Sequence, residues 1–194
     1  MPVKLKRDKS RIIKNSRTQQ LEARNKSLVK ILNEVQLNLK KKIASDKSFY
    51  QDLLTNLIVE GMVRMMEEEI YVYCLEKDKN IVNSLLKFSK ERYQKIIMEQ
   101  LGTKVDCKIA LGNESMKERK LVDLTSVPVH QITKDHEESI YIPAEIDDKY
   151  CFGGIVLKNK SEDIILKNTL DLRIELAFQK GLPEIRKILI PRDK

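Results

Sequence analysis

Hydrophobic residues recur at helical spacing in four stretches of the chain. The first stretch, residues 5–44, contains no proline or glycine and predicts one continuous helix about 60 Å long, at about 1.5 Å per residue. Large apolar side chains are sparse before Leu21 and become regular only further along. A helix with so little to bury in its first half needs a partner helix to stay folded. The regular stripe consists of Leu28, Ile31, Leu32, Val35, Leu39 and Ile43.

Three further helices and four strands are predicted downstream. A second amphipathic helix starts after a break at Asp46, and Asp78 is placed to cap a third. Asn168 and Thr169 are placed to cap the last helix, which Pro183 is expected to kink or restart. Runs of β-branched, aromatic and alternating residues predict strands at residues 70–74, 105–111, 152–157 and 164–166.

This order of elements predicts an α/β (α+β) fold. A long N-terminal helix is followed by a compact domain with a small mixed β-sheet of about four strands, packed by helices. We place the basic helical arm at residues 1–44 and the globular domain at residues 45–194. Residues 112–149 are expected to form mostly a long exposed loop, with one strand near Tyr141.

Charge separates the arm from the rest of the chain. The net charge is +8, but residues 1–44 hold 13 Lys and Arg against 3 Asp and Glu, which gives +10 and leaves −2 for the remainder. No run of about 18 apolar residues occurs, so no membrane-spanning helix is predicted. The basic N-terminus has no apolar segment behind it, so we expect no secretory signal peptide.

Few residues are patterned for chemistry. Cys74, Cys107 and Cys151 are widely separated and read as reduced thiols on or beside strands. A metal site at His130 and His136 lacks a third ligand in any recognisable pattern. We therefore predict no metal ligands.

Phosphate-binding and catalytic signatures are also missing from the sequence. No GxxxxGK[ST] loop is present, and the glycine pair at residues 153–154 precedes a strand rather than a helix. The methionines of the second helix fit core packing better than an adaptable binding groove, although both uses are open to them. We predict no catalytic residue and no cofactor.

Three phrases in the last third of the chain resemble the C-terminal signature of the E subunit of the V-type (vacuolar) proton-pumping ATPase. They are residues 153–157, 168–173 and 182–186, in matching order and spacing. Residues 57–67 and 70–74 resemble the helix-then-strand segment of that family. The resemblance implies structural roles for Gly153, Gly154, Asn168, Thr169, Leu170, Arg173, Leu182, Pro183, Ile185 and Arg186.

The chain departs from the family pattern in two places. Glu67 is followed by further glutamates, where members have a proline. Members also begin with a longer helix, which suggests that this chain starts partway along it, as a shortened or divergent form.

The resemblance implies a function as well as a fold. The family's E subunit is a non-catalytic part of the peripheral stalk in the V1 sector, on the cytoplasmic side of vacuolar or other acidic-organelle membranes. Its helix pairs with the G subunit, and its globular domain contacts the A and B subunits of the catalytic head and other stalk-contacting subunits. We expect Leu21, Leu28, Leu32, Val35 and Leu39 to face the partner helix, or the globular domain where the arm meets it.

The basic arm also fits two other kinds of partner. Lysine and arginine displace counterions from nucleic acid, although no aromatic residue precedes Phe49 to stack on bases. Anionic lipid is a third partner class, but the first twenty residues lack the bulky apolar face that would insert beside headgroups.

Overall fold

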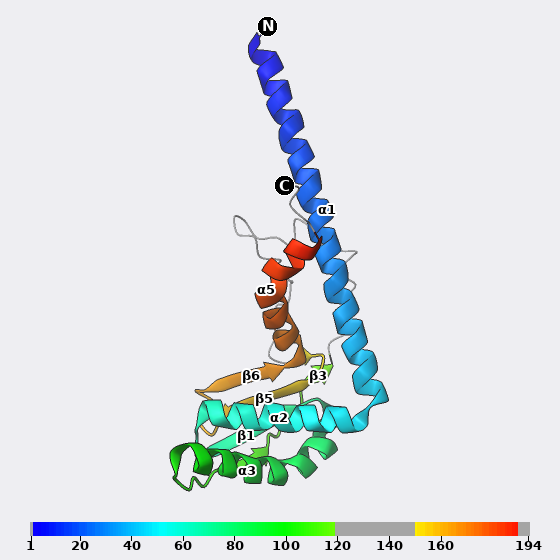
Figure 1. Cartoon of the computed structure of the whole chain (residues 1–194). Coiled ribbons are helices and arrows are strands. Elements are labelled where there is room, and N and C mark those ends of the chain that lie inside the picture. Colours follow the sequence, from blue (N-terminus) through cyan, green and yellow to red (C-terminus); the bar gives the residue numbers. More distant parts are fainter. Residues whose placement is uncertain (1, 119–149, 190–194) are drawn as a thin grey trace. The chain divides into compact units, whose positions relative to one another are not determined.

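The computed structural model describes residues 2–118 and 150–189 (Figure 1). The described residues fall into two compact units, one formed by residues 2–39 and the other by the described residues from 40 onward. Within these residues the chain is an α/β protein with a long N-terminal helix and a four-stranded mixed sheet, as the sequence predicts.

Helix α1 (Pro2–Ser45) is 44 residues long and uninterrupted (Figure 1), which confirms the predicted continuous helix. Its side chains between residues 6 and 24 are exposed. Further along, Leu28, Val29 and Leu32 are at most 2% exposed. The burial of α1 is therefore uneven along its length, as the sparse early apolar residues predict.

A single residue separates helix α2 (Lys47–Met65) from the end of α1. Asp46 occupies this junction, and its carboxylate accepts a hydrogen bond of 2.9 Å from the amide of Phe49. The ammonium of Lys42 lies 4.3 Å from the centroid of the Phe49 ring. Met66, the residue directly after α2, adopts a left-handed conformation and is exposed. Met66 is thus wrongly predicted as a core residue, whereas Met62 and Met65 are buried.

The main sheet has the strand order β2-β1-β5-β6. Strand β1 pairs in parallel with β2, and β5 pairs antiparallel with both β1 and β6. Parallel neighbours need a crossover connection, which is supplied here by a 3-10 turn η1 (Glu76–Asp78) and helix α3 (Lys79–Leu101). The strands are β1 (Glu69–Cys74), β2 (Lys108–Leu111), β5 (Gly154–Asn159) and β6 (Ile165–Thr169).

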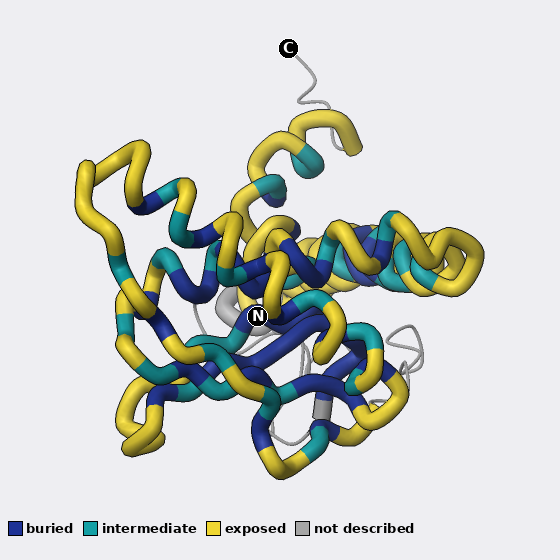
Figure 2. The backbone as a smooth tube through the Cα atoms, turned by 90° about the horizontal axis from the view of Figure 1, so that it is seen from below, coloured by how far each residue is buried: buried dark blue, intermediate teal, exposed yellow. Residues whose placement is uncertain are grey.

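Helices α2 and α3 pack together and against the sheet (Figure 1). Alternate residues of β1 are buried, and four consecutive residues at the start of β5 are buried, so β5 is covered on both faces. Figure 2 shows buried positions in the strands and along one side of each of these helices. The core includes Leu54, Leu57, Ile58, Met62, Ile70, Val72, Val82, Ile97, Ile155 and Leu157.

A second, two-stranded sheet was not predicted. Strand β3 (Lys117–Glu118) pairs in parallel with β4 (Tyr150–Cys151), beside an isolated bridge between Leu75 and Met116. Leu75, Met116 and Cys151 form a small apolar cluster with Val156 of β5. Within the region predicted to be mostly an exposed loop, Met116 is instead buried in this cluster, and Lys117 and Glu118 are exposed as expected but form a strand. The predicted strand near Tyr141 and both histidines lie outside the described residues.

Helix α5 (Leu170–Leu189) continues through Pro183, so the helix does not restart there, and the alternative of a kink at Pro183 stays a prediction. Two predicted caps also need correction. Asn168 belongs to strand β6, and its side chain bonds elsewhere, as shown below. Asp78 does precede α3, but its side chain makes no capping hydrogen bond.

Candidate functional site

Six of the signature residues lie where β5, β6 and the first turn of α5 come together. The amide of Leu170 donates a 3.0 Å hydrogen bond to the carbonyl of Gly153. Gly154 has a φ of +91°, and a Cβ built there would lie 2.7 Å from the carbonyl oxygen of Asn168. Only glycine fits this combination of backbone conformation and close approach. Gly154 therefore allows a close backbone approach between the start of β5 and the end of β6.

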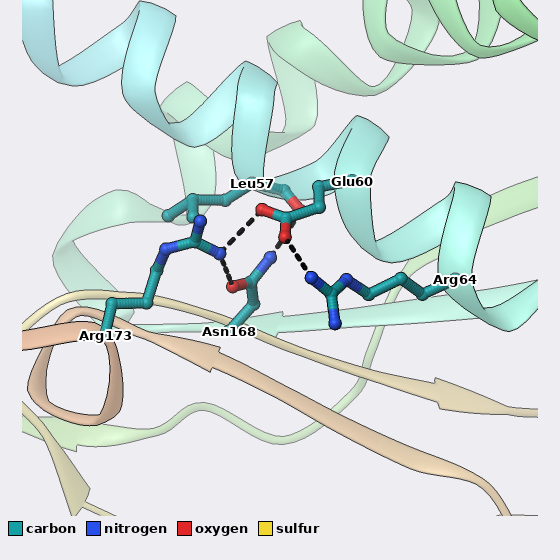
Figure 3. A network of polar contacts seen from close by, with 5 residues as sticks. All are labelled: Leu57, Glu60, Arg64, Asn168 and Arg173. Atoms are coloured by element: carbon teal, nitrogen blue, oxygen red, sulfur yellow. Dashed lines mark hydrogen bonds and ion pairs between the residues drawn. The ribbon is translucent and has the colours of Figure 1, made fainter. Parts of the chain in front are cut away.

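Asn168 is the centre of a polar network that joins β6 to α2 (Figure 3). Its Nδ2 donates to the carbonyl of Leu57 at 2.8 Å, and its Oδ1 accepts from Arg173 Nη1 at 2.5 Å. The same arginine nitrogen donates to Glu60 Oε2 at 2.6 Å, and Arg64 Nη2 donates to Glu60 Oε1 at 2.9 Å. The network thus satisfies a buried amide and connects α2 to β6 and α5, which follow it by more than 100 residues in the sequence.

Glu60 stays ionised in this setting. Partial burial raises the pKa of its carboxyl, but hydrogen bonds and charge from Arg173 and Arg64 outweigh that effect and hold the pKa below its usual range. A carboxylate bound by two guanidinium groups is a poor proton acceptor. The arrangement is therefore suited to holding α2, β6 and α5 together, and no reaction is assigned to it.

The two arginines of the network are expected to contribute unequally to stability. Arg173→Met removes the partner of the buried Asn168 amide oxygen, so we expect a loss of about 1–2 kcal/mol in unfolding free energy. Arg64→Met is the matched control, since Arg64 is 66% exposed and binds only Glu60 in the network, and about 0.5 kcal/mol or less is expected. Urea denaturation measures both, and equal losses would contradict a special role for Arg173.

The same comparison has a defined pH dependence. A lowered folded-state pKa means that Glu60 contributes stability above its unfolded pKa of about 4.3 and loses that contribution as pH falls through the folded value. The difference in unfolding free energy between wild type and Arg173→Met should therefore decrease below about pH 4.

The other four signature residues lie further along α5 and take no part in the network. Leu182 is buried, Ile185 and Arg186 are half-buried, and Pro183 is exposed. Thr169 is buried at the end of β6. The signature is thus a set of packing and backbone positions spread over one hairpin and one helix.

A second buried polar contact was not foreseen from the sequence. The hydroxyl of Tyr50 donates a 2.6 Å hydrogen bond to Asp78 Oδ2, and the backbone of Gly154 also hydrogen-bonds to that hydroxyl. Tyr50 and Asp78 are 6% and 4% exposed. Burial raises the pKa of Asp78, and the bond from Tyr50 opposes that rise. The helical spacing of apolar residues in α2 accounts for the burial of Tyr50, but it carries no signal for the partner of its hydroxyl.

The cysteines behave as small core residues. Cys74 lies in β1, Cys151 in β4, and Cys107 directly before β2, and all three are buried. Burial raises the pKa of Cys74 to about 11 and that of Cys151 to about 12. Both are therefore protonated at neutral pH and unreactive as nucleophiles.

A hollow of about 440 Å³ lies beside the small sheet. Its charged groups largely pair with one another: Lys77 binds Glu118 at 2.9 Å, and Ser115 donates to Glu76. Such pairing leaves little free charge to hold a ligand. The hollow is lined by Leu75, Glu76, Lys77, Ser115, Met116, Lys117 and Glu118.

The described segments present neither a metal centre nor a membrane span. No group of three or more His, Cys, Asp or Glu side chains in residues 2–118 and 150–189 is arranged to hold a metal ion. Every helix within these residues is too short or too polar to cross a bilayer.

The five residues predicted to face a partner helix differ in exposure. Leu28 and Leu32 are buried, and Leu39 is half-buried. Leu21 and Val35 are 57% and 45% exposed. The structure does not test their partner, but Leu21 and Val35 are the ones available to another molecule.

Comparison with known proteins gives one family. The family model of the ATP synthase (E/31 kDa) subunit matches residues 2–190. The E subunit of the V-type proton ATPase from Gossypium hirsutum is 32% identical over 148 residues, which cover 76% of this chain and 54% of the Gossypium protein. The E3 subunit from Arabidopsis thaliana is 33% identical over 72% of this chain, and the E 2 subunit from Bos taurus is 25% identical over 90%.

The matched segment covers 48% of the Arabidopsis E3 protein and 61% of the Bos taurus protein, so the chain spans about half the length of these relatives. The family match nevertheless runs through the arm, the sheet and the last helix. This chain therefore belongs to the ATP synthase E/31 kDa family, which comprises the E subunits of V-type proton ATPases that its C-terminal signature resembles.

Proposed function

We propose that this chain is a non-catalytic peripheral-stalk, or stator, component of the V1 sector of a V-type proton ATPase. In this role it pairs with the G subunit and holds the catalytic head of A and B subunits against the torque of the turning rotor. It would work on the cytoplasmic side of an acidic-organelle membrane. The observation that carries the proposal is a 44-residue uninterrupted helix in a member of the E-subunit family.

The physics of α1 suits a stator. A helix of this length spans about 66 Å at about 1.5 Å per residue, and its backbone hydrogen bonds make it stiff along the axis. Exposed apolar side chains at Leu21 and Val35 favour a second helix alongside. Pairing would roughly double the cross-section and stiffen the rod further.

The compact unit suits an anchor. Its charged groups at the signature network bond to one another, and its helices and sheet share one apolar core. A domain held together in this way resists deformation under load. The proposal therefore assigns ATP hydrolysis to other subunits and assigns force transmission to this chain.

Pairing with the G subunit can be tested at two exposed residues, Leu21 and Val35. Leu21 and Val35 are two heptads apart, so they lie close to one line along α1. The double variant Leu21→Asp with Val35→Asp places charge on that line, and co-purification with the G subunit should fall at least about tenfold. Leu37→Asp is the control, because Leu37 is 48% exposed but lies on a different face of the helix. The control should stay within about twofold of wild type.

The measurement is a pull-down of the tagged full chain from native membranes. Retention of the G subunit by the double variant, or equal loss with Leu37→Asp, would refute these two residues as the pairing line. Absence of A, B and G subunits from the wild-type pull-down would sink the proposed function itself.

A further inference from the structure

The cations in the first half of α1 lie on one side of the helix. Residues 6–24 contain seven Lys and Arg, against Asp8 and Glu22. At about 100° per residue, all of these cations except Lys9 fall within about 80° of the line that runs along α1 through Leu32. The six are Lys6, Arg7, Arg11, Lys14, Arg17 and Arg24. We call this set the basic stripe.

The opposite side of the same segment carries no net charge. Asp8 and Lys9 offset each other there, and the other residues on that side include Ile12, Ser16 and Gln19. Glu22 is the one anion near the stripe, and it lies at its edge. The electrostatic field of this segment is therefore strongest on one face.

The basic stripe is open to another molecule. All six of its side chains are exposed. None of them forms an ion pair with any residue that the structure describes. Six like charges on one face repel one another, so an acidic surface laid against them would relieve that repulsion.

We infer that residues 6–24 of α1 bind an acidic helix whose carboxylates face Arg7, Arg11 and Lys14. These three residues follow one another at steps of four and three, which is the spacing at which a second helix contacts a first. The same line continues through Thr18 to exposed Leu21, where the contact becomes apolar. The partner helix is therefore acidic at one end and apolar opposite Leu21.

A helix fits this pattern better than nucleic acid or a lipid surface. Charge and apolar contact are separated along the axis of α1, whereas a helix lying on a membrane carries both around its circumference at every level. No aromatic side chain occurs in α1 to stack on bases. The inference rests on the proposed function, because it states the chemistry of the G-subunit surface that would pair with this end of the arm.

Matched charge reversals on two faces test the inference. The triple variant Arg7→Glu, Arg11→Glu, Lys14→Glu reverses the stripe. The control Lys9→Glu, Lys26→Glu, Lys30→Glu makes the same change in net charge on the other side of the helix. Binding of each full-length chain to the purified G subunit of the same organism is measured by calorimetry at about 50 mM and about 500 mM NaCl.

The stripe reversal should raise the Kd about tenfold or more at low salt, and the control should change it by about twofold or less. The difference in Kd between the stripe reversal and the control should become smaller at high salt, where exposed charges are screened. Far-UV circular dichroism checks that both variants keep their helix content, which is expected because glutamate has nearly the same helix propensity as lysine and arginine.

The outcomes separate the inference from the function on which it rests. A wild-type chain that does not bind the G subunit overturns both. Binding by wild type with equal effects of the two triple variants overturns the inference alone. A stripe reversal that spares G-subunit binding but abolishes binding to phosphatidylserine vesicles or to a mixed-sequence DNA duplex also overturns it, and gives the stripe to that other partner.

Discussion

Replacing Gly154 by alanine is expected to lower the unfolding free energy by about 3 kcal/mol or more. The new Cβ would meet the carbonyl oxygen of Asn168 at 2.7 Å and the amide nitrogen of Leu170 at 3.0 Å, and both are backbone atoms. Neither can move without shifting strand β6 or the start of α5. The φ of +91° adds strain of its own.

A second glycine separates these two effects. Gly102 also has a positive φ, of +66°, but an added Cβ there meets nothing within 4 Å. Gly102→Ala should therefore cost only about 1 kcal/mol, from the left-handed backbone alone. Urea denaturation of both variants measures the difference. Equal losses would show that the close approach at Gly154 is unimportant.

Replacing Tyr50 by phenylalanine is expected to lower the unfolding free energy by about 2–3 kcal/mol at neutral pH. The hydroxyl that is lost donates a 2.6 Å hydrogen bond to a carboxylate that is 4% exposed. Asp78 would then be buried as an ion with one fewer donor. Tyr93→Phe is the matched control, because Tyr93 is 1% exposed and its hydroxyl bonds to none of the described residues. That control should cost about 0.5 kcal/mol or less.

The effect of Tyr50→Phe should depend on pH in a definite direction. Burial raises the folded-state pKa of Asp78, so its protonated form is favoured by folding, and stability declines as pH rises from the unfolded pKa of about 3.9 through the folded value. Removing the Tyr50 donor raises that pKa further. The penalty of the variant should therefore be full at pH 7 and shrink as pH falls through the two raised folded-state pKa values, both of which lie above about 3.9. A penalty that stays constant from pH 3 to pH 7 would refute the pairing.

The helices and main-sheet strands could be predicted because each has a local period. The 3.6-residue spacing of α2 and the β-branched run at residues 70–74 are properties of short windows, and packing only reinforces them. The pair of two-residue strands, β3 and β4, has no period to read, since it exists through pairing between segments more than thirty residues apart. Its register depends on the cluster around Met116.

The side-chain roles were harder to predict than the elements. Asn168 lies two residues before α5, where a helix cap is the local preference. Its side chain instead hydrogen-bonds to the backbone carbonyl of Leu57 and the guanidinium of Arg173. Asp78 is a similar case, since Tyr50 takes the carboxylate that would have capped α3. Long-range partners override a local preference of about 1 kcal/mol, and one sequence does not display them.

The arm shows the reverse balance. The length, exposure and charge of the arm could all be predicted from the sequence, because an exposed helix is governed by local propensity and spacing. The burial of Val29 and the exposure of Val35 could not be predicted from the sequence, because they depend on which side chains distant in sequence pack against α1.

The bond between Asn168 and Leu57 spans 111 residues, and this separation has a consequence during synthesis. During translation, α2 emerges from the ribosome long before β5 and β6 are synthesised. The side of α2 that packs against these strands therefore stays exposed on the nascent chain until they are made. Folding of the compact unit must wait for the hairpin and the first turn of α5. We therefore expect chaperone dependence in the cell, and polypeptides released before residue 173 should aggregate or be degraded.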